Sequence, residues 1–153
     1  MSLPPFWTLV QNHGDELMRH AKRLVGDADA EDVMQEALLR ALRSYPRLAH
    51  ADHLRAWLYR VTTTTAYDLA RRKKGEVPVE AVPERAEGVS YEDGSFEALI
   101  DRLSDGAKEA MRLRFVHDLA YEEIGRRLGC SAQAARQRVS TGVWELRKEM
   151  SWR

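Results

Sequence analysis

Four side chains near the C-terminus have the types and the spacing that suit the reading of DNA bases. Gln133, Arg136, Gln137 and Arg138 all lie in the first turns of a predicted helix. In the major groove, Arg can form two hydrogen bonds with a guanine and Gln can form two with an adenine. The sequence therefore indicates a base-reading helix in this part of the chain.

The elements around these side chains predict a helix-turn-helix. Residues 121–128 have a helical apolar pattern, and Gly129 follows, where a left-handed residue can end a helix. Ser131 stands in an N-cap position, and the helical pattern resumes from Ala132 to Leu146. Two helices joined by a short turn containing glycine place the second helix in the DNA major groove. An ordinary antiparallel helix pair with a solvated basic face is the alternative that this stretch alone leaves open.

Charge is segregated along the chain, although the formal net charge of the 153 residues is zero. Residues 51–75 hold six basic and two acidic side chains, and residues 102–153 hold eleven basic and seven acidic ones. Residues 76–101 between them hold one basic and eight acidic side chains. Two basic segments on either side of an acidic connector predict two nucleic-acid surfaces. The zero total predicts weak DNA affinity without a partner, because phosphate neutralisation provides most non-specific binding.

Composition and periodicity predict an all-α fold of two small helical domains joined by a flexible acidic linker. The first domain, residues 1–74, has helical patterns over 6–25, 29–45 (with Asp29 as N-cap) and 53–74. Four consecutive threonines, 62–65, lie in the third of these patterns, where helix is favoured and strand is the alternative. Residues 75–95 contain Pro, Gly and acids without periodicity, which is typical of a linker. The second domain, 96–153, has one further helical pattern from Leu99 to Phe115 before the helix pair.

Enzymatic, metal-binding and membrane functions find no support in the sequence. No apolar run approaches the roughly 20 residues that span a bilayer, and the N-terminus does not resemble a signal peptide. The single cysteine, Cys130, suits a reducing cytoplasm and is expected to be packed in the turn. His50 and His53 lie close to Asp52, but no second group of ligands accompanies them. We expect a cytoplasmic protein that is not an enzyme and has no catalytic residue, metal site or cofactor.

Several short motifs, taken in order, resemble one family over nearly the whole chain. The first half contains DAEDVMQE at 29–36 and AWLYRV at 56–61, followed by Asp68 and an Arg pair at 71–72. The second half contains LAYEEIG at 119–125, then the turn and basic positions of the helix-turn-helix. In this order, across an acidic linker, the motifs resemble a bacterial RNA polymerase sigma factor of the extracytoplasmic-function (ECF) type. The resemblance implies a sigma region 2-like domain, a linker and a sigma region 4-like domain.

The resemblance also implies partners and site residues. The partners would be the clamp helices and β flap of bacterial core RNA polymerase, promoter DNA, and an anti-sigma factor, which in this family is often membrane-anchored. Residues 103–115 would support the β-flap contact. The core-polymerase contacts would be Asp32, Gln35, Glu36, Leu39 and Arg40. The contacts to the −10 promoter element would be Arg47, His50, Asp52, Arg55, Arg60, Thr63, Thr64, Arg71, Arg72, Lys73 and Lys74. The contacts to the −35 element would be Ser131, Gln133, Ala134, Arg136, Gln137 and Arg138.

Three departures from the family pattern indicate unusual promoter elements. Thr64 stands where the family usually has Asn, Gln133 stands in place of Gly, and Ala134 in place of Thr. The leading interpretation is an alternative sigma factor that recruits core polymerase to promoters. A sigma-like decoy that sequesters an anti-sigma factor is the alternative, and the basic residues of both domains argue against it. A regulator that never becomes the specificity subunit of polymerase is a third possibility, against which the pattern of Asp32, Gln35 and Glu36 argues.

Overall fold

The structure, a computed structural model, describes residues 3–49, 51–75 and 94–151. Within these ranges the chain forms seven α-helices and one short 3-10 helix, and no strand. The predicted all-α fold is therefore confirmed. Most of the predicted linker, 75–95, lies outside the described residues, so the predicted domain boundaries stay a prediction.

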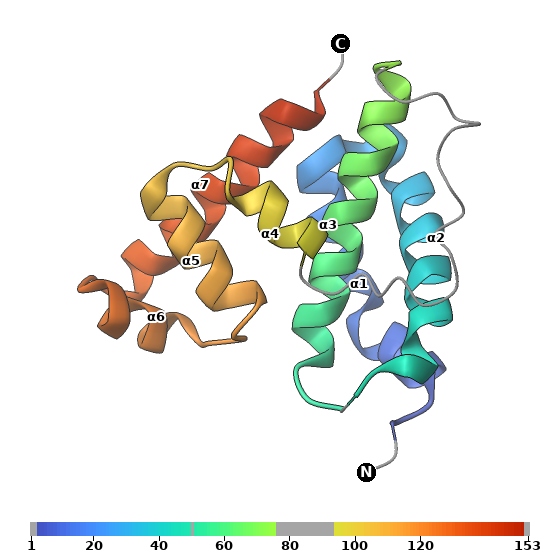
Figure 1. Cartoon of the computed structure of the whole chain (residues 1–153), viewed down its shortest axis with the longest axis horizontal. Coiled ribbons are helices and arrows are strands. Elements are labelled where there is room, and N and C mark those ends of the chain that lie inside the picture. The colour runs from blue at the N-terminus through green and yellow to red at the C-terminus, as the bar shows by residue number, and fades with distance from the viewer. Residues whose placement is uncertain (1–2, 50, 76–93, 152–153) are drawn as a thin grey trace.

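The N-terminal helices form a three-helix bundle (Figure 1). Helix α1 (Phe6–Val25), α2 (Asp27–Ser44) and α3 (Leu54–Lys73) each pack against the other two, and the 3-10 helix η1 (Tyr45–Arg47) follows α2. Their shared core contains Leu17, Leu24 and Val33, each almost fully buried.

The four threonines of α3 are helical and buried. Thr62, Thr63, Thr64 and Thr65 each expose 2% of their surface or less. Each hydroxyl donates a hydrogen bond to a carbonyl oxygen four residues earlier in the helix, at 2.7 to 3.0 Å. These bonds satisfy the polar groups that burial takes away from water, which explains how a run of β-branched residues remains helical here.

The start of α2 differs from the prediction. Asp29 was expected to be the N-cap, but the helix begins at Asp27 and Gly26 is its N-cap residue. Gly26 has φ 85°, a conformation that glycine adopts without steric cost, so α1 ends and α2 begins without an intervening loop. The Asp29 carboxylate instead accepts a hydrogen bond from Lys73 at the end of α3.

The C-terminal helices form the second group. They are α4 (Gly94–Ile100), α5 (Asp105–Phe115), α6 (Tyr121–Leu128) and α7 (Ala132–Met150). The single helical pattern expected over 99–115 is interrupted at residues 101–104, where Leu103 turns into the core. Gly142 of α7 allows close packing there, because a Cβ atom at this position would lie 2.6 Å from Cγ of Met111.

The two groups of helices pack directly against each other. Helix α7 contacts α1 and α3, while α4 and α5 contact α3, which therefore lies between the two groups (Figure 1). Phe115, at the end of α5, has its ring stacked on that of Tyr59 at 5.3 Å between centroids and lies 6.0 Å from the ring of His20. The apolar core consequently continues from one domain into the other.

Candidate nucleic-acid and partner interfaces

The turn of the helix-turn-helix is fixed by short-range contacts. Gly129 ends α6 with φ 72°, as predicted, and the amide of Cys130 donates to the carbonyl of Gly125 at 2.8 Å. The hydroxyl of Ser131 accepts a hydrogen bond from the amide of Ala134 at 3.0 Å, so the predicted N-cap of α7 is confirmed. Gly125 leaves no room for a larger residue, since a Cβ atom there would lie 2.5 Å from the carbonyl oxygen of Cys130. Cys130 itself is partly buried against the core.

The predicted base-reading side chains lie on the outer face of α7. Gln133, Arg136 and Gln137 are exposed, and Ala134 and Arg138 are half-buried. The guanidinium of Arg136 lies 5.0 Å from the centre of the Tyr121 ring, which restricts its position without burying it. The arrangement leaves three hydrogen-bonding side chains at the N-terminal end of α7 accessible to a partner.

Basic residues beside this surface were missed by the sequence analysis. Arg126 and Arg127 of α6 are exposed and donate hydrogen bonds to Glu123, which lowers the pKa of that carboxyl below its ordinary value. Arg114 of α5 also lies near this surface, with its guanidinium 4.3 Å from the centre of the Tyr121 ring. The two arginines of α6 could have been predicted as DNA-backbone contacts, because the first helix of a helix-turn-helix crosses the DNA backbone.

One face of α2 carries most of the predicted core-polymerase contacts. Asp32, Gln35 and Leu39 are exposed, and Glu36 is half-buried. Leu39 exposes 49% of its surface, and Leu42, three residues later on the same helix, exposes 51%. Leu42 was not predicted, although its spacing from Leu39 places both on one face. Two exposed leucines beside acidic and amide groups form a surface that suits an apolar and basic partner.

Arg40, the fifth residue of that set, is buried. It exposes 3% of its surface and donates hydrogen bonds to Asp68 at 2.7 Å and to Glu36 at 3.1 Å. It thus connects α2 to α3, and in this conformation its side chain does not lie on the exposed face of α2.

The residues predicted to contact the −10 element fall into two groups. In the first group, Arg47, Asp52 and Lys73 are exposed, and Arg55, Arg71, Arg72 and Lys74 are half-buried. Arg55 is paired with Glu16 at 2.5 Å, and Lys73 with Asp29. His50 lies outside the described residues.

The second group is buried within α3. Thr63 and Thr64 expose 1% and 2% of their surface, and Arg60 exposes 8%. Arg60 donates to the carbonyl of Phe115, and the hydroxyl of Thr63 lies 2.8 Å from Nε2 of His20. The structure therefore brings these three residues into the interior, while the first group lies nearer the surface.

His20 is the most perturbed titratable group of this interior. It exposes 4% of its surface and also meets the Tyr59 ring edge-on at 4.9 Å. Burial first, and then the nearby positive charge of Arg23, lowers the pKa of His20 to about 3. The imidazole is consequently neutral at physiological pH.

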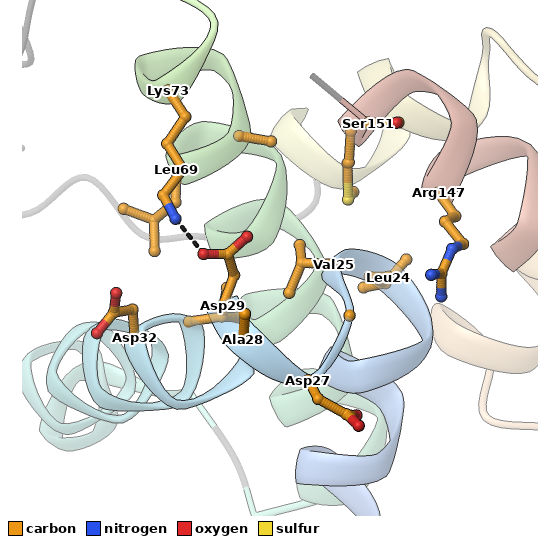
Figure 2. A pocket seen from close by; sticks show the side chains of 14 residues that line it. Leu24, Val25, Asp27, Ala28, Asp29, Asp32, Leu69, Lys73, Arg147 and Ser151 are labelled. Carbon is orange, nitrogen blue, oxygen red and sulfur yellow. Dashed lines mark hydrogen bonds and ion pairs between the residues drawn. The ribbon is translucent and has the colours of Figure 1, made fainter. Parts of the chain in front are cut away.

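A cavity lies where the α1–α2 turn, the end of α3 and the end of α7 meet. Its volume is about 290 Å³, and Figure 2 shows Leu24 and Val25 on one side and Arg147 and Ser151 on another. Asp29 and Lys73, which are hydrogen-bonded to each other, both line the cavity. It holds no nucleophile with a base beside it, and among the residues described there is no group of three or more His, Cys, Asp or Glu side chains arranged to hold a metal ion. Nor does any described helix have the length and apolar character needed to cross a membrane.

Comparison with known sequences defines the class of protein. The profile of sigma-70 region 2 matches residues 9–76, which contain most of α1 and all of α2 and α3. The profile of sigma-70 region 4 matches residues 99–148, which contain α6 and nearly all of α7. The order of the two regions is the order predicted from the sequence motifs.

Similarity to individual relatives defines the family. The chain is 33% identical to the ECF RNA polymerase sigma factor SigE of Mycolicibacterium smegmatis over 95% of its own length and 62% of that protein's length. It is 31% identical to an RNA polymerase sigma-E factor of Streptomyces avermitilis over 97% of its own length and 86% of that protein's. The chain belongs to the ECF family of RNA polymerase sigma factors. It is thus an alternative sigma factor, a protein that directs transcription, and its family points to a regulator that is not an enzyme.

Two solved structures are similar to the chain at lower identity. One is the sigma factor RpoE of Bartonella quintana in complex with the anti-sigma factor NepR, with 23% identity, a TM-score of 0.48, and coverage of 94% of this chain and 96% of that one. The other is CnrH in complex with the cytosolic domain of CnrY, with 20% identity, a TM-score of 0.44, and coverage of 95% and 84%. Both scores are below 0.5, and the family assignment depends on the sequence matches instead.

Proposed function

We propose that this sigma factor binds core RNA polymerase through the exposed face of α2 and recognises two promoter elements with its two domains. In this proposal, the N-terminal end of α7 reads the −35 element as duplex, and the loop from Arg47 to Asp52 together with α3 binds the −10 element. The observation that carries it is the set of exposed hydrogen-bonding side chains, Gln133, Arg136 and Gln137, at the capped start of the second helix of a helix-turn-helix.

The −35 assignment is supported by the exposure of these side chains and by their chemistry. They are exposed on α7, whereas Ala135 and Val139 of the same helix are buried against the rest of the domain. Arg and Gln at the start of a recognition helix are suited to guanine and adenine edges. Because Gln133 and Ala134 depart from the family pattern, we expect the preferred −35 sequence to differ from that of typical relatives.

The core-polymerase assignment is supported by an exposed apolar face. Leu39 and Leu42 are the two most exposed leucines described, and Gln35 and Asp32 lie on the same helix. We add Leu42 to the predicted contacts and place Arg40 behind them, as a residue that positions Glu36. The surface suits the clamp helices that family membership implies as a partner.

The −10 assignment rests on the basic residues that remain near the surface. Arg47 and Lys73 are exposed and Arg71 and Arg72 are half-buried, so cations are available along the loop and the end of α3. Flipping a base costs a few kcal/mol, which the protein must offset by stacking and edge hydrogen bonds. His50, in the same loop, remains part of this prediction.

An anti-sigma factor completes the proposed set of partners. Family membership supports it, and a partner of this kind would hold the sigma factor away from polymerase until a signal releases it. We place the protein in the cytoplasm, where core polymerase acts, and propose no cofactor.

The test is run-off transcription with purified bacterial core polymerase on fragmented genomic DNA, with and without the protein. We expect discrete start sites that depend on the protein, and sequences upstream of them would reveal both promoter elements. Binding to core without new start sites would favour a decoy that sequesters an anti-sigma factor, and failure to bind core would overturn the proposal.

Substitution of Arg136 tests the −35 assignment separately. We expect Arg136→Ala to weaken binding to a duplex −35 site by about 1–3 kcal/mol, because one base contact is lost. Lys148→Ala is the matched control, since Lys148 is an exposed cation on the same helix three turns away. Equal losses in the two variants would show that Arg136 contributes only charge.

A further inference from the structure

A single stripe along α3 contains several of the residues assigned to the −10 element. Arg60, Thr64, Tyr67, Arg71 and Lys74 are spaced by four, three, four and three residues, which places them on one face of the helix. All except Tyr67 are predicted contacts to the unwound DNA strand. This stripe is the side of α3 that meets the C-terminal domain.

Phe115 covers the first part of the stripe. Its carbonyl accepts a hydrogen bond from Arg60, and its ring stacks on Tyr59 at 5.3 Å. Arg60 exposes only 8% of its surface as a result, although an arginine of this kind must reach solvent to bind a phosphate. Thr64 lies one turn further along and exposes 2%.

Arg102 and Glu149 cover the remainder. Arg102 donates to the hydroxyl of Tyr67 at 2.6 Å, and its guanidinium lies 5.4 Å from the centre of that ring. The carbonyl of Glu149, near the end of α7, accepts a hydrogen bond from Lys74. The C-terminal domain therefore contacts the stripe at Arg60, Tyr67 and Lys74, over its whole length.

Two contacts outside the stripe hold the same arrangement. Nδ1 of His53 lies 2.9 Å from the carboxylate of Asp118, and both residues have positive φ angles, 61° and 55°. Arg147 of α7 donates to the carbonyl of Arg23 at 2.8 Å at the end of α1. These two contacts are polar and lie near the surface, as in interdomain interfaces that open and close.

We propose that the free protein is autoinhibited, with its helix-turn-helix domain masking the face of α3 that binds the −10 strand. This inference rests on the proposed −10 assignment and adds a regulatory state to it. Single-stranded DNA cannot reach Arg60 or Thr64 until the two domains separate. The apparent affinity for the strand is then the intrinsic affinity reduced by the fraction of open molecules.

The masking is selective for one of the two DNA surfaces. Gln133, Arg136 and Gln137 remain exposed in the closed arrangement, so duplex reading by α7 is not hindered. The free protein consequently binds duplex DNA with its C-terminal domain but does not hold an unwound strand. Separation of the domains, as on binding to polymerase, is required before the −10 strand is held.

Hydroxyl-radical footprinting of the unmodified protein tests the closed state directly. We expect slow oxidation of Tyr59 and Phe115, compared with the exposed Trp7 and Trp144 in the same molecule. Oxidation of Tyr59 as fast as that of Trp144 would mean that the domains are apart in solution, and would overturn the inference.

A double variant, Arg102→Ala with Arg147→Ala, tests whether opening uncovers the strand-binding face. Both residues are exposed and make interdomain hydrogen bonds. The probes are a labelled 30-nucleotide single strand of random sequence and a random duplex of equal length. We expect single-strand affinity relative to duplex affinity to rise about two- to tenfold, since each exposed polar contact stabilises the closed state modestly. Simple charge loss predicts weaker binding to both probes.

The matched control is Arg19→Ala with Lys148→Ala, which also removes two exposed cations but breaks no described interdomain hydrogen bond. We expect it to bind both probes equally or slightly less well than the unmodified protein. If the Arg102/Arg147 variant behaves like this control, masking is overturned. Run-off transcription by the unmodified protein tests the proposed function separately. If start sites that depend on the protein appear, the proposed function stands even though the masking inference is overturned.

Discussion

Helices α3 and α7 are both long, and both contain residues predicted to contact promoter DNA, yet they present them in opposite ways. Helix α7 buries Ala135, Val139 and Val143 against its own domain and leaves exposed three of the four side chains predicted to read bases, Gln133, Arg136 and Gln137. Helix α3 is buried from Arg60 to Ala66 without interruption, because one domain packs on each side of it. Helix α7 contacts α1 and α3 but keeps these predicted base-reading side chains exposed, whereas the buried side chains in the middle of α3 can reach a partner only if the two domains separate.

The largest expected effect concerns the interior beside α3. Because the pKa of His20 is about 3 in the folded chain and near its ordinary 6.5 in the unfolded chain, protons bind the unfolded state between these values. The contribution of His20 to the free energy of unfolding is present above pH 6.5 and is lost as the pH falls. The loss is up to roughly 1.4 kcal/mol per pH unit and reaches about 4 kcal/mol near pH 3.5.

Urea unfolding at several pH values measures this contribution. His20→Gln retains an amide that can bond Thr63 but has no group that titrates, so its unfolding free energy should fall less steeply with acid. The carboxyl groups affect the unmodified protein and the variant alike, so the difference between their curves of unfolding free energy against pH isolates the contribution of His20. Parallel curves would show that His20 is accessible to protons in the folded chain, and would remove the contrast between the two helices.

The second effect concerns the turn that positions α7. Gly125→Ala places a Cβ atom within 2.5 Å of the Cys130 carbonyl oxygen, and backbone must shift to relieve it. We expect a loss of roughly 3 kcal/mol, at the upper end of the range for overpacking, together with weaker duplex binding. Gly106→Ala is the control, because nothing lies within 4 Å of a Cβ atom there. Thermal unfolding of both variants checks this prediction, and equal melting temperatures would contradict it.

The third effect separates the threonines of α3. Thr63→Val leaves the buried Nε2 of His20 without its partner at 2.8 Å, which costs about 1–3 kcal/mol. Thr62→Val removes a hydroxyl that bonds only the carbonyl of Leu58 in its own helix, and we expect a loss of less than about 1 kcal/mol. Chemical unfolding of the two isosteric variants measures the difference. Equal losses would argue against the bond between His20 and Thr63.

The difference between the two helices also shows how far the sequence could predict the molecule. The helix-turn-helix was predictable because its signals are local: Gly129 ends one helix, Ser131 begins the next, and apolar spacing assigns the buried face. The all-α fold and the family were predictable for the same reason, since periodicity and short motifs lie within single elements.

The surroundings of α3 were not predictable from the same kind of signal. The apolar pattern of α3 predicts that one side of the helix is buried. A second side is also covered, because Phe115 and Arg102, which are distant in the sequence, pack on it. Arginine is usually a surface residue, so burial of Arg40 was not expected from the sequence. Only the fold brings Asp68 within 2.7 Å of its guanidinium. The Asp29 N-cap prediction failed because Gly26 adopts a positive φ angle and serves as the N-cap residue three positions earlier. The predicted contact residues themselves stay predictions.

The smallest effect concerns Ser131, which was predicted both as the N-cap of α7 and as a −35 contact. Its hydroxyl already accepts a hydrogen bond from the amide of Ala134 at 3.0 Å, so Ser131→Ala should cost about 1 kcal/mol of stability. Ser131→Asn restores a cap and should recover most of that loss in thermal unfolding. If both variants bind a −35 duplex equally well once folded, Ser131 serves α7 only as its cap. If Ser131→Asn is stable but binds weakly, the serine also contacts DNA, and the exposed DNA-binding surface of α7 extends to its N-cap residue.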